Sequence, residues 1–306
     1  MDRDTQPDPF RTFEGAPRVQ LVLRDPAEGP TYQTALLEGQ VEPAPLTHTM
    51  ISQLFQDGLA SPSGRSLTRP AGPSASTPSA ATSIRPRVTS SVVLSRASTT
   101  RGCTGIHLES LARTLPGPGQ VPFSALPWRP HVHLLVFVHR VQGLEPGLYC
   151  LVRDPAAYDN LHNHLAPEAA WIRQASCPPN FPFYLLAEGD VRSTAAGLSC
   201  GQSIVADGVY AVAMVAEFEE ALKARGASFY KRLHWEAGLI GQLLYLEAEA
   251  LDIRSTGIGC FFDDSTHRVA GMKGHTFQDL YHFTLGGPVD DDRLVTQPPY
   301  AHLGEA

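Results

Sequence analysis

Alternating runs of apolar and polar residues divide the second half of the chain into strands and helices. Apolar runs of strand length are expected at 131–139, 147–152, 209–215 and 281–285. Helices are expected at 192–206 and 228–251, a short helix or a loop at 219–223, and a loop leading into a strand at 255–262. Because strands and helices are interspersed, we expect an α+β fold in which helices flank a mixed, mostly antiparallel sheet.

The long helix expected at 228–251 is the most informative element. Its apolar residues at 239, 240, 243, 244 and 246 lie almost all round the helix, which predicts a buried helix. Gly238 and Gly241 cost about 1 kcal/mol each against alanine, so they suggest close approach of another backbone or a flat ligand. Gly257-Ile-Gly259 then predicts a loop whose amides face a ligand. On pattern alone, helix packing followed by a turn is the favoured explanation of these residues.

The composition changes sharply along the chain. Residues 60–108 are rich in Ser, Thr and Pro and contain no acidic residue. Such a segment cannot bury enough apolar surface to offset its ordering entropy, so we expect disorder there. Residues 109–306 have the composition of an ordinary globular domain, and 1–59 form a third region of mixed character.

Charge and cysteine content exclude several classes of function. The formal charge is −7 and no basic stripe occurs, which argues against nucleic-acid binding. No apolar stretch of about 18 residues predicts a membrane span. The five cysteines are odd in number and lack CxxC spacing, so neither structural zinc nor a disulfide framework is expected, and a reducing cytoplasm is the simplest setting. His131 and His133 lack a third metal ligand, and no metal site is expected.

Several separated motifs, in the right order, resemble the nitroreductase superfamily, and more narrowly the SagB-type dehydrogenases and their tandem-domain relatives. These motifs are the long helix with its loop and the segments 111–116, 127–130, 145–149, 198–202, 280–289 and 297–300. The resemblance implies a three-layer α+β sandwich that binds FMN. It also implies hydride transfer through flavin N5 between NAD(P)H or a substrate and an acceptor. A homodimer and a small-molecule or peptide-heterocycle substrate are further expectations of this resemblance.

The resemblance also nominates cofactor-binding residues. It implies that the amides of Gly259 and Cys260 face N5 and O4 of the flavin, with Gly257 shaping the turn. A basic residue near the end of the sheet would hold the phosphate, and Arg293 is the candidate unless it is a solvated arginine. Gln202 could line the site, cap a helix or face solvent, whereas the Cys260 side chain is expected to be small and buried rather than nucleophilic. The full set is Gln202, Gly257, Gly259, Cys260, Gly286, Gly287 and Arg293. No catalytic acid or base is nominated.

The first third of the chain departs from the SagB-type pattern. Residues 1–59 resemble the start of the tandem relatives, but the flavin loop Asn-Pro-x-Ser-Gly-Asn-Leu-His-Pro-Thr-Glu is absent. Codons can be chosen for 72–91 whose nucleotides, read one base earlier, spell this loop. We therefore hypothesise that 60–108 is translated out of frame, which the gene sequence would decide, and that the Arg-x-Ser match at 96–98 is accidental. The alternative to an FMN-dependent oxidoreductase is then a degraded, non-catalytic flavin-binding remnant.

Overall fold

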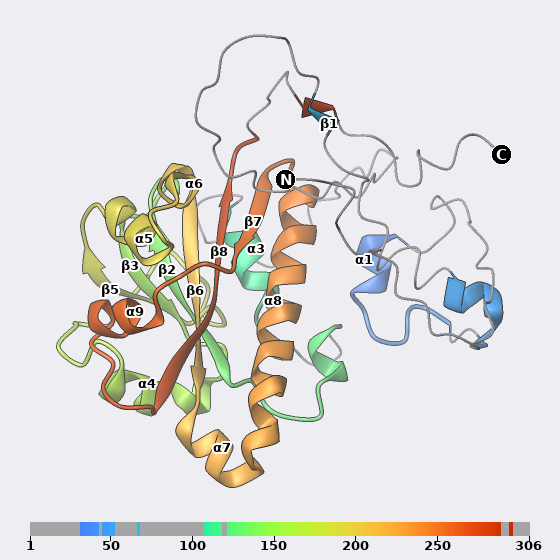
Figure 1. The fold of residues 1–306 in the computed structure, drawn as a ribbon, viewed down its shortest axis with the longest axis horizontal. Helices are drawn as coiled ribbons and strands as arrows, with labels where there is room; N and C mark the ends of the chain where they lie inside the picture. Colours follow the sequence, from blue (N-terminus) through green and yellow to red (C-terminus); the bar gives the residue numbers. More distant parts are fainter. Residues whose placement is uncertain are drawn as a thin grey trace, which may run out of the picture.

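The computed structural model describes residues 31–42, 45–52, 66–67, 107–117, 121–288 and 294–295. Within them, the centre of the fold is a seven-stranded sheet of order β4-β5-β3-β2-β6-β8-β7 (Figure 1). Its strands are β2 (Val132–Val138), β3 (Gly147–Leu151), β4 (Ile172–Arg173), β5 (Phe183–Glu188), β6 (Tyr210–Glu217), β7 (Arg254–Ile258) and β8 (Phe277–Gly286). All neighbouring strands pair antiparallel, so the expected mostly antiparallel sheet is confirmed, without the parallel pair that a mixed sheet would contain.

The sheet is buried on both faces because its central strands carry apolar side chains at nearly every position. Every residue of β2 and of β6 is buried. Leu134 and Val136 point to one face, and Leu135 and Phe137 to the other, as the two-residue period of a strand requires. Two separate hydrophobic cores result, one on each side of the sheet.

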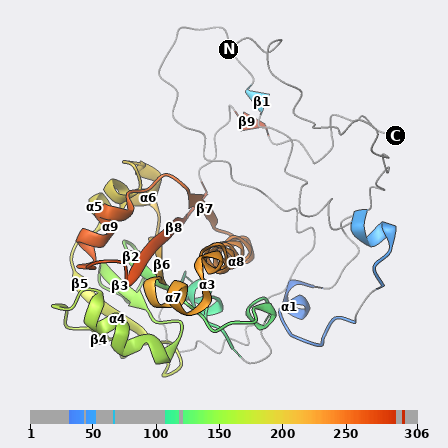
Figure 2. The ribbon, with the colours of Figure 1, turned by 60° about the horizontal axis from the view of Figure 1, so that its bottom comes forward.

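Helices cover both cores, which gives the three layers seen end-on in Figure 2. One face is covered by α3 (His107–Arg113) and α8 (Tyr230–Ala250). The other face is covered by α4 (Tyr158–His164), α5 (Arg192–Leu198), α6 (Ser203–Asp207) and α9 (Asp263–Val269). The remaining elements are α1 (Tyr32–Ala35), α7 (Glu219–Arg225), short 3-10 turns at Phe123–Ala125, Pro155–Ala157 and Ala227–Phe229, and the two-residue strands β1 (Ser66–Leu67) and β9 (Leu294–Val295). The expected α+β sandwich is confirmed.

The long helix α8 differs from the sequence expectation because it is buried along one side only. Leu233, Ile240 and Leu244 are buried, but Trp235 is 55% exposed and Gly238 lies on the same solvent-facing side. The close approach predicted at Gly241, of another backbone or a flat ligand, is not found, since a Cβ there would lie in ordinary contact, 3.5 Å from the ring of Phe283. The flat group against this glycine is therefore a side chain of the sheet and not a ligand.

Three element boundaries were wrong. The single helix expected at 192–206 is broken into α5 and α6, because Cys200 and Gly201 adopt φ of 56° and 72°. The loop expected at 255–262 begins as strand β7, which pairs with β8 from Arg254 to Ile258. The last strand, expected at 281–285, starts earlier, at Phe277.

The expected boundaries of the first two regions cannot be compared with the structure. Of residues 1–59 only 31–42 and 45–52 are described, and of 60–108 only 66–67 and 107–108. The expected disorder and the out-of-frame hypothesis thus fall almost entirely outside the described residues. In the part of the chain that is described, no helix is long and apolar enough to cross a membrane.

Candidate functional site

The edge strand β7 and the loop that follows it, 259–262, carry the amides nominated for cofactor binding. β7 lies at one end of the sheet order and pairs only with β8. The amide of Gly257 points away from β8 and donates to the Tyr245 hydroxyl of α8 over 2.7 Å. Outward amides recur at every second residue of an edge strand, so the next one belongs to Gly259. The role expected for Gly257, shaping a turn, is therefore wrong: it is a strand residue whose amide is already engaged.

Tyr281 occupies the space beside Gly257. A Cβ on Gly257 would collide with the Tyr281 hydroxyl and come within 3.0 Å of its ring. Burial raises the pKa of Tyr281, and the nearby Tyr245 raises it further, so the hydroxyl stays protonated at neutral pH. Glycine is required at 257 because an aromatic side chain of the protein lies against it.

The amides of Gly259 and Cys260 remain available. Both residues are exposed, and among the described residues neither amide nitrogen has an acceptor within hydrogen-bond distance. Neighbouring donors of this kind can bind two acceptors on the edge of a planar ligand. The structure therefore leaves free the two amides that the nitroreductase resemblance nominated.

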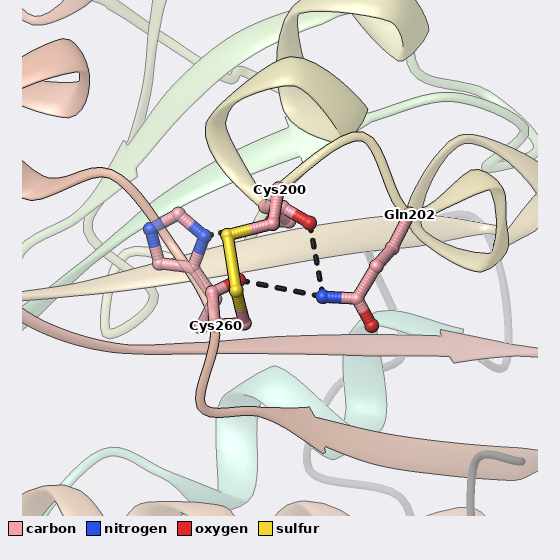
Figure 3. Close-up of a disulfide and its surroundings, with 5 residues drawn as sticks. Cys200, Gln202 and Cys260 are labelled. Carbon is pink, nitrogen blue, oxygen red and sulfur yellow. Dashed lines mark hydrogen bonds between the residues drawn. A yellow bond between two sulfur atoms is a disulfide. The ribbon is translucent and has the colours of Figure 1, made fainter. Parts of the chain in front are cut away.

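A disulfide joins this loop to the corner between α5 and α6 (Figure 3). Cys260 is bonded to Cys200, 60 residues earlier in the chain, with 5.9 Å between their Cα atoms. The buried, unreactive environment expected for the Cys260 side chain is wrong, since the residue is exposed and oxidised. The cysteine count and spacing gave no sign of this pair.

Gln202 provides a second connection between the same two segments. Its Nε2 donates to the carbonyls of Ser199, at 2.9 Å, and of Cys260, at 3.3 Å (Figure 3). The amide of Phe262 also donates to the Leu198 carbonyl over 2.8 Å. Gln202 thus lies beside the candidate amides, as expected, and its side-chain amide nitrogen is committed to holding the loop.

A buried chain of polar groups lies behind the loop and was not anticipated. His282 of β8 contacts the Ser199 hydroxyl through Nδ1 at 2.8 Å and the Asp279 carboxylate through Nε2 at 2.7 Å. With a neutral imidazole, Nε2–H donates to the carboxylate and Nδ1 accepts from the hydroxyl. The ring of Phe261 stacks on His282 with centroids 4.7 Å apart. Ser199 is only 1% exposed, so this arrangement orders the loop's underside and offers no nucleophile to a substrate.

A β-bulge explains why the sequence spacing did not predict the contact between Asp279 and His282. Asp279 and His282 are three residues apart, a spacing that puts side chains on opposite faces of a regular strand. The pairing of β8 with β6 shifts so that Val215 faces Asp279 while Met214 faces Tyr281. The extra residue, Leu280, returns Asp279 to the face of His282.

The other nominated residues lie elsewhere. Gly286 pairs with Arg254 at the far end of β7, about 17 Å along the strand from Gly259 at roughly 3.3 Å per residue. A Cβ on Gly286 would come within 3.1 Å of the Gly208 backbone, so this glycine permits strand packing. Gly287 is exposed, with nothing within 4 Å of a Cβ. Arg293 falls outside the described residues.

The residues of the loop fit one edge of a flavin ring. The donor set is two amides, of Gly259 and Cys260, which matches the two acceptors N5 and O4. The Gly257 amide cannot contribute, because Tyr245 holds it. The loop from 259 to 262 contains no cation, so the flavin phosphate would need a charge from another segment.

The cavities formed by described residues lie away from this loop. One of about 220 Å³ is bordered by Leu36, Arg113, Val121 and Leu243. A more open groove of about 540 Å³ is bordered by His139, Glu145, Glu188, Asp190 and Arg192. Neither cavity is bordered by Gly259 or Cys260, and both of these residues are exposed.

The two histidines considered as metal ligands are buried and serve the fold. His133 Nδ1 accepts a hydrogen bond from the Arg153 amide at 3.1 Å. His131 lies 3.4 Å from the Glu217 carboxylate, which Arg129 also contacts at 2.6 Å. Burial alone would raise the pKa of Glu217, but hydrogen bonds from His131 and Arg129 lower it to about 2. Among the described residues, no group of three or more His, Cys, Asp or Glu side chains could hold a metal ion.

His133 should make stability pH-dependent. Burial lowers its pKa from 6.5 to about 3, so the folded state keeps it neutral while the unfolded chain binds a proton below pH 6.5. Its stabilising contribution is complete above pH 6.5 and is lost as the pH falls. We expect this residue alone to lower the free energy of unfolding by about 2 kcal/mol between pH 8 and pH 5. Urea unfolding of His133→Asn, which keeps an acceptor but cannot titrate, should lack this loss; an unchanged pH dependence would contradict the assignment.

Comparison with known proteins gives remote structural neighbours. No family model matches the sequence, and no curated protein matches it. A putative nitroreductase from Anabaena variabilis is 26% identical with a TM-score of 0.40; the match covers 52% of this chain and 27% of that one, so the chain spans about a quarter of its length. The E. coli microcin synthetase McbBCD complex with truncated pro-MccB17 bound is 18% identical, with a TM-score of 0.42 and coverage of 82% and 84%.

A putative nitroreductase from Ralstonia eutropha is 13% identical, has a TM-score of 0.38, and the match covers 89% of each chain. All three TM-scores are below 0.5. The three structures are two putative nitroreductases and a microcin synthetase complex.

Proposed function

We propose that the chain is an FMN-dependent oxidoreductase of the nitroreductase type, in which loop 259–262 holds the pyrimidine side of the flavin. The observation that supports this is the pair of exposed amides, Gly259 and Cys260, without acceptors in the described chain. They occur where the motif resemblance requires them, just beyond the long helix and strand β7. Bound FMN would supply hydride chemistry at N5.

The residues around these amides fix their direction. The hydrogen bond from the Gly257 amide to the Tyr245 hydroxyl fixes the position of the last residues of β7. Gln202 and the disulfide hold Cys260 from the other side. Two donors held in this way would orient a flavin edge without rearrangement of the loop. The conformational entropy of ordering the loop would be lost on folding and not on binding.

The expected partners follow from the resemblance. We propose NAD(P)H or a reduced substrate as the electron donor, and a nitro group, a quinone or a peptide azoline as candidate reactants. We further propose that a second protomer, or a segment outside the described residues, completes the site. The absence of a cation in loop 259–262 supports this, because a phosphate needs charge-assisted contacts from elsewhere.

One observation favours the alternative of a non-catalytic remnant. The loop Asn-Pro-x-Ser-Gly is absent from the sequence, and loop 259–262 contains no cation, so contacts to the FMN phosphate would be missing. A hydrogen bond to a charged group contributes about 1.5–3 kcal/mol. Without two such phosphate contacts, FMN would bind roughly 10²- to 10⁴-fold more weakly.

The experiment that separates these functions compares two variants at one position. Gly259→Pro removes the amide N–H, while Gly259→Ala keeps it. Alanine fits at this position because a Cβ at 259 would only touch the Tyr281 ring at 4.0 Å. FMN titration, followed by quenching of flavin fluorescence, should show binding roughly 10-fold weaker for Gly259→Pro, the effect of one lost hydrogen bond. Gly259→Ala should bind like the unmodified chain.

The visible spectrum then decides activity. A yellow protein with bound-flavin absorbance that bleaches on addition of NAD(P)H supports the oxidoreductase. A protein that binds FMN but is not reduced by NAD(P)H or a substrate would be the remnant. Equal affinity of all three proteins for FMN, or no affinity at all, would exclude loop 259–262 as the flavin-binding loop.

A further inference from the structure

Cys260 contributes both a candidate flavin-binding amide and one half of a disulfide. Its backbone is in loop 259–262, and its side chain crosses to the α5–α6 corner (Figure 3). Cys260 is exposed, whereas Cys200 is half-buried. Exposed disulfides are the class that thiol reagents reduce readily, while structural disulfides are shielded.

The Cys200 side of the bridge is held in an unfavourable conformation. Cys200 has φ of 56°, in the left-handed region that residues with a Cβ rarely adopt. The following Gly201 has φ of 72°, and its amide donates to the Ala196 carbonyl over 2.8 Å to close α5. When the covalent bond is cut, this corner loses a constraint that favours the strained residue.

The surrounding contacts would survive reduction. Gln202 still joins Ser199 to Cys260, and Phe262 still donates to Leu198. The His282 chain beneath the loop is independent of the two sulfur atoms. Opening of the bridge should therefore make loop 259–262 less ordered while the sheet stays folded.

We propose that the Cys200–Cys260 disulfide is a reversible redox lock, reduced by small dithiols, that holds loop 259–262 in its ligand-binding conformation. A dithiol's thiolate attacks Sγ of Cys260, the S–S bond breaks, and Cys200 leaves as a thiolate that takes a proton from water. The reagent's second thiolate then attacks the reagent sulfur of the mixed disulfide. This closes the reagent's own disulfide and releases Cys260 as a thiolate, which takes a proton from water. The dithiol is oxidised to a disulfide, and the protein gains two thiols. The consequence for flavin affinity rests on the proposed function.

The test compares oxidised and dithiothreitol-reduced protein by hydrogen–deuterium exchange without FMN. Mass spectrometry first establishes whether Cys200 and Cys260 are linked in the oxidised sample. We expect exchange of the hydrogen-bonded amides of Gly201, Gln202 and Phe262 to become about 10-fold faster on reduction, with the β2 and β6 amides unchanged, since local opening exposes only nearby amides. Reoxidation should restore slow exchange. Cys260→Ser should resemble the reduced protein, and Gln202→Ala should enlarge the effect of reduction.

A matched control uses a cysteine outside the bridge. Cys177 is buried and lies outside the Cys200–Cys260 bridge, and Cys177→Ala should respond to dithiothreitol like the unmodified chain. Free thiols at 200 and 260 in the oxidised sample, or unchanged loop exchange after reduction, would overturn the lock. FMN titration of both states serves as a separate measurement. Weaker FMN binding to the reduced state supports the lock. Absence of FMN binding in both states contradicts the proposed function, and the exchange measurement alone then tests the lock.

Discussion

Glu236→Ala should lower the free energy of unfolding by about 3–5 kcal/mol, measured by urea denaturation. Glu236 of α8 faces Arg153, and the two side chains are completely buried, with Arg153 Nη1 2.5 Å from Glu236 Oε1. The carboxylate also accepts from the amides of His131, at 3.0 Å, and Val132, at 3.2 Å. Removing it leaves a charged guanidinium and two amides without their acceptor in the core.

Arg153 amplifies this effect because it cannot reach water. It follows β3, its Nε donates to the Thr114 carbonyl, and its guanidinium lies 4.6 Å from the centre of the Phe123 ring. Burial lowers the pKa of Arg153, and Glu236 partly restores it, so the pair is stable only together. The pair thus joins α8, β2 and the segment after α3 at one point.

Two controls separate buried charge from simple truncation. The double variant Arg153→Met with Glu236→Leu should recover much of the lost stability, because replacing a whole buried pair by apolar groups is often neutral. Asp190→Ala removes the exposed partner of Arg192 and should leave stability unchanged within error. A double variant as unstable as Glu236→Ala would show that packing, not the unpaired charge, dominates.

Removing the disulfide should have the second-largest effect. Under oxidising conditions, the free energy of unfolding of the double variant Cys200→Ser with Cys260→Ser should be about 2–4 kcal/mol lower than that of the original chain. The reason is that the bridge closes a loop of 60 residues in the unfolded chain. Serine is close to cysteine in size, so the folded packing changes little. The midpoint of urea unfolding measures the loss.

The same measurement in a reductant is its control. With dithiothreitol present, the original chain also lacks the bridge, and its midpoint should fall to that of the double variant. If the gap between the two proteins persists in the reductant, the serine substitutions disturb the folded state, and the constraint on the unfolded chain is not the cause.

Much of the fold could be predicted because its central elements carry strong local patterns. The apolar run at 131–139 became β2, 209–215 became most of β6, and the spacing in 228–251 became α8. The strand β5 was missed, although the apolar stretch Phe183–Glu188 stands between Pro182 and Gly189. The break after α5 was missed because nothing local shows that Cys200 adopts a positive φ.

The candidate site was less predictable because it depends on contacts distant in the sequence. The amides of Gly259 and Cys260 were nominated by a motif resemblance, and their role in cofactor binding stays a prediction. The disulfide unites residues 60 positions apart, and cysteine counting cannot reveal such pairing. Gly286 resembled a ligand-binding glycine but meets the Gly208 backbone, which only three-dimensional packing shows.

The position of β8 has a consequence for how the chain assembles. β8 lies between β6 and β7, yet it follows both in the sequence. A nascent chain that ends before residue 277 therefore has β6 uncovered along one side and β7 with no neighbour. Until β8, with its 10 residues, leaves the ribosome, the unpaired edges of β6 and β7 are open to strands from other chains, so a chaperone would protect the chain during this interval.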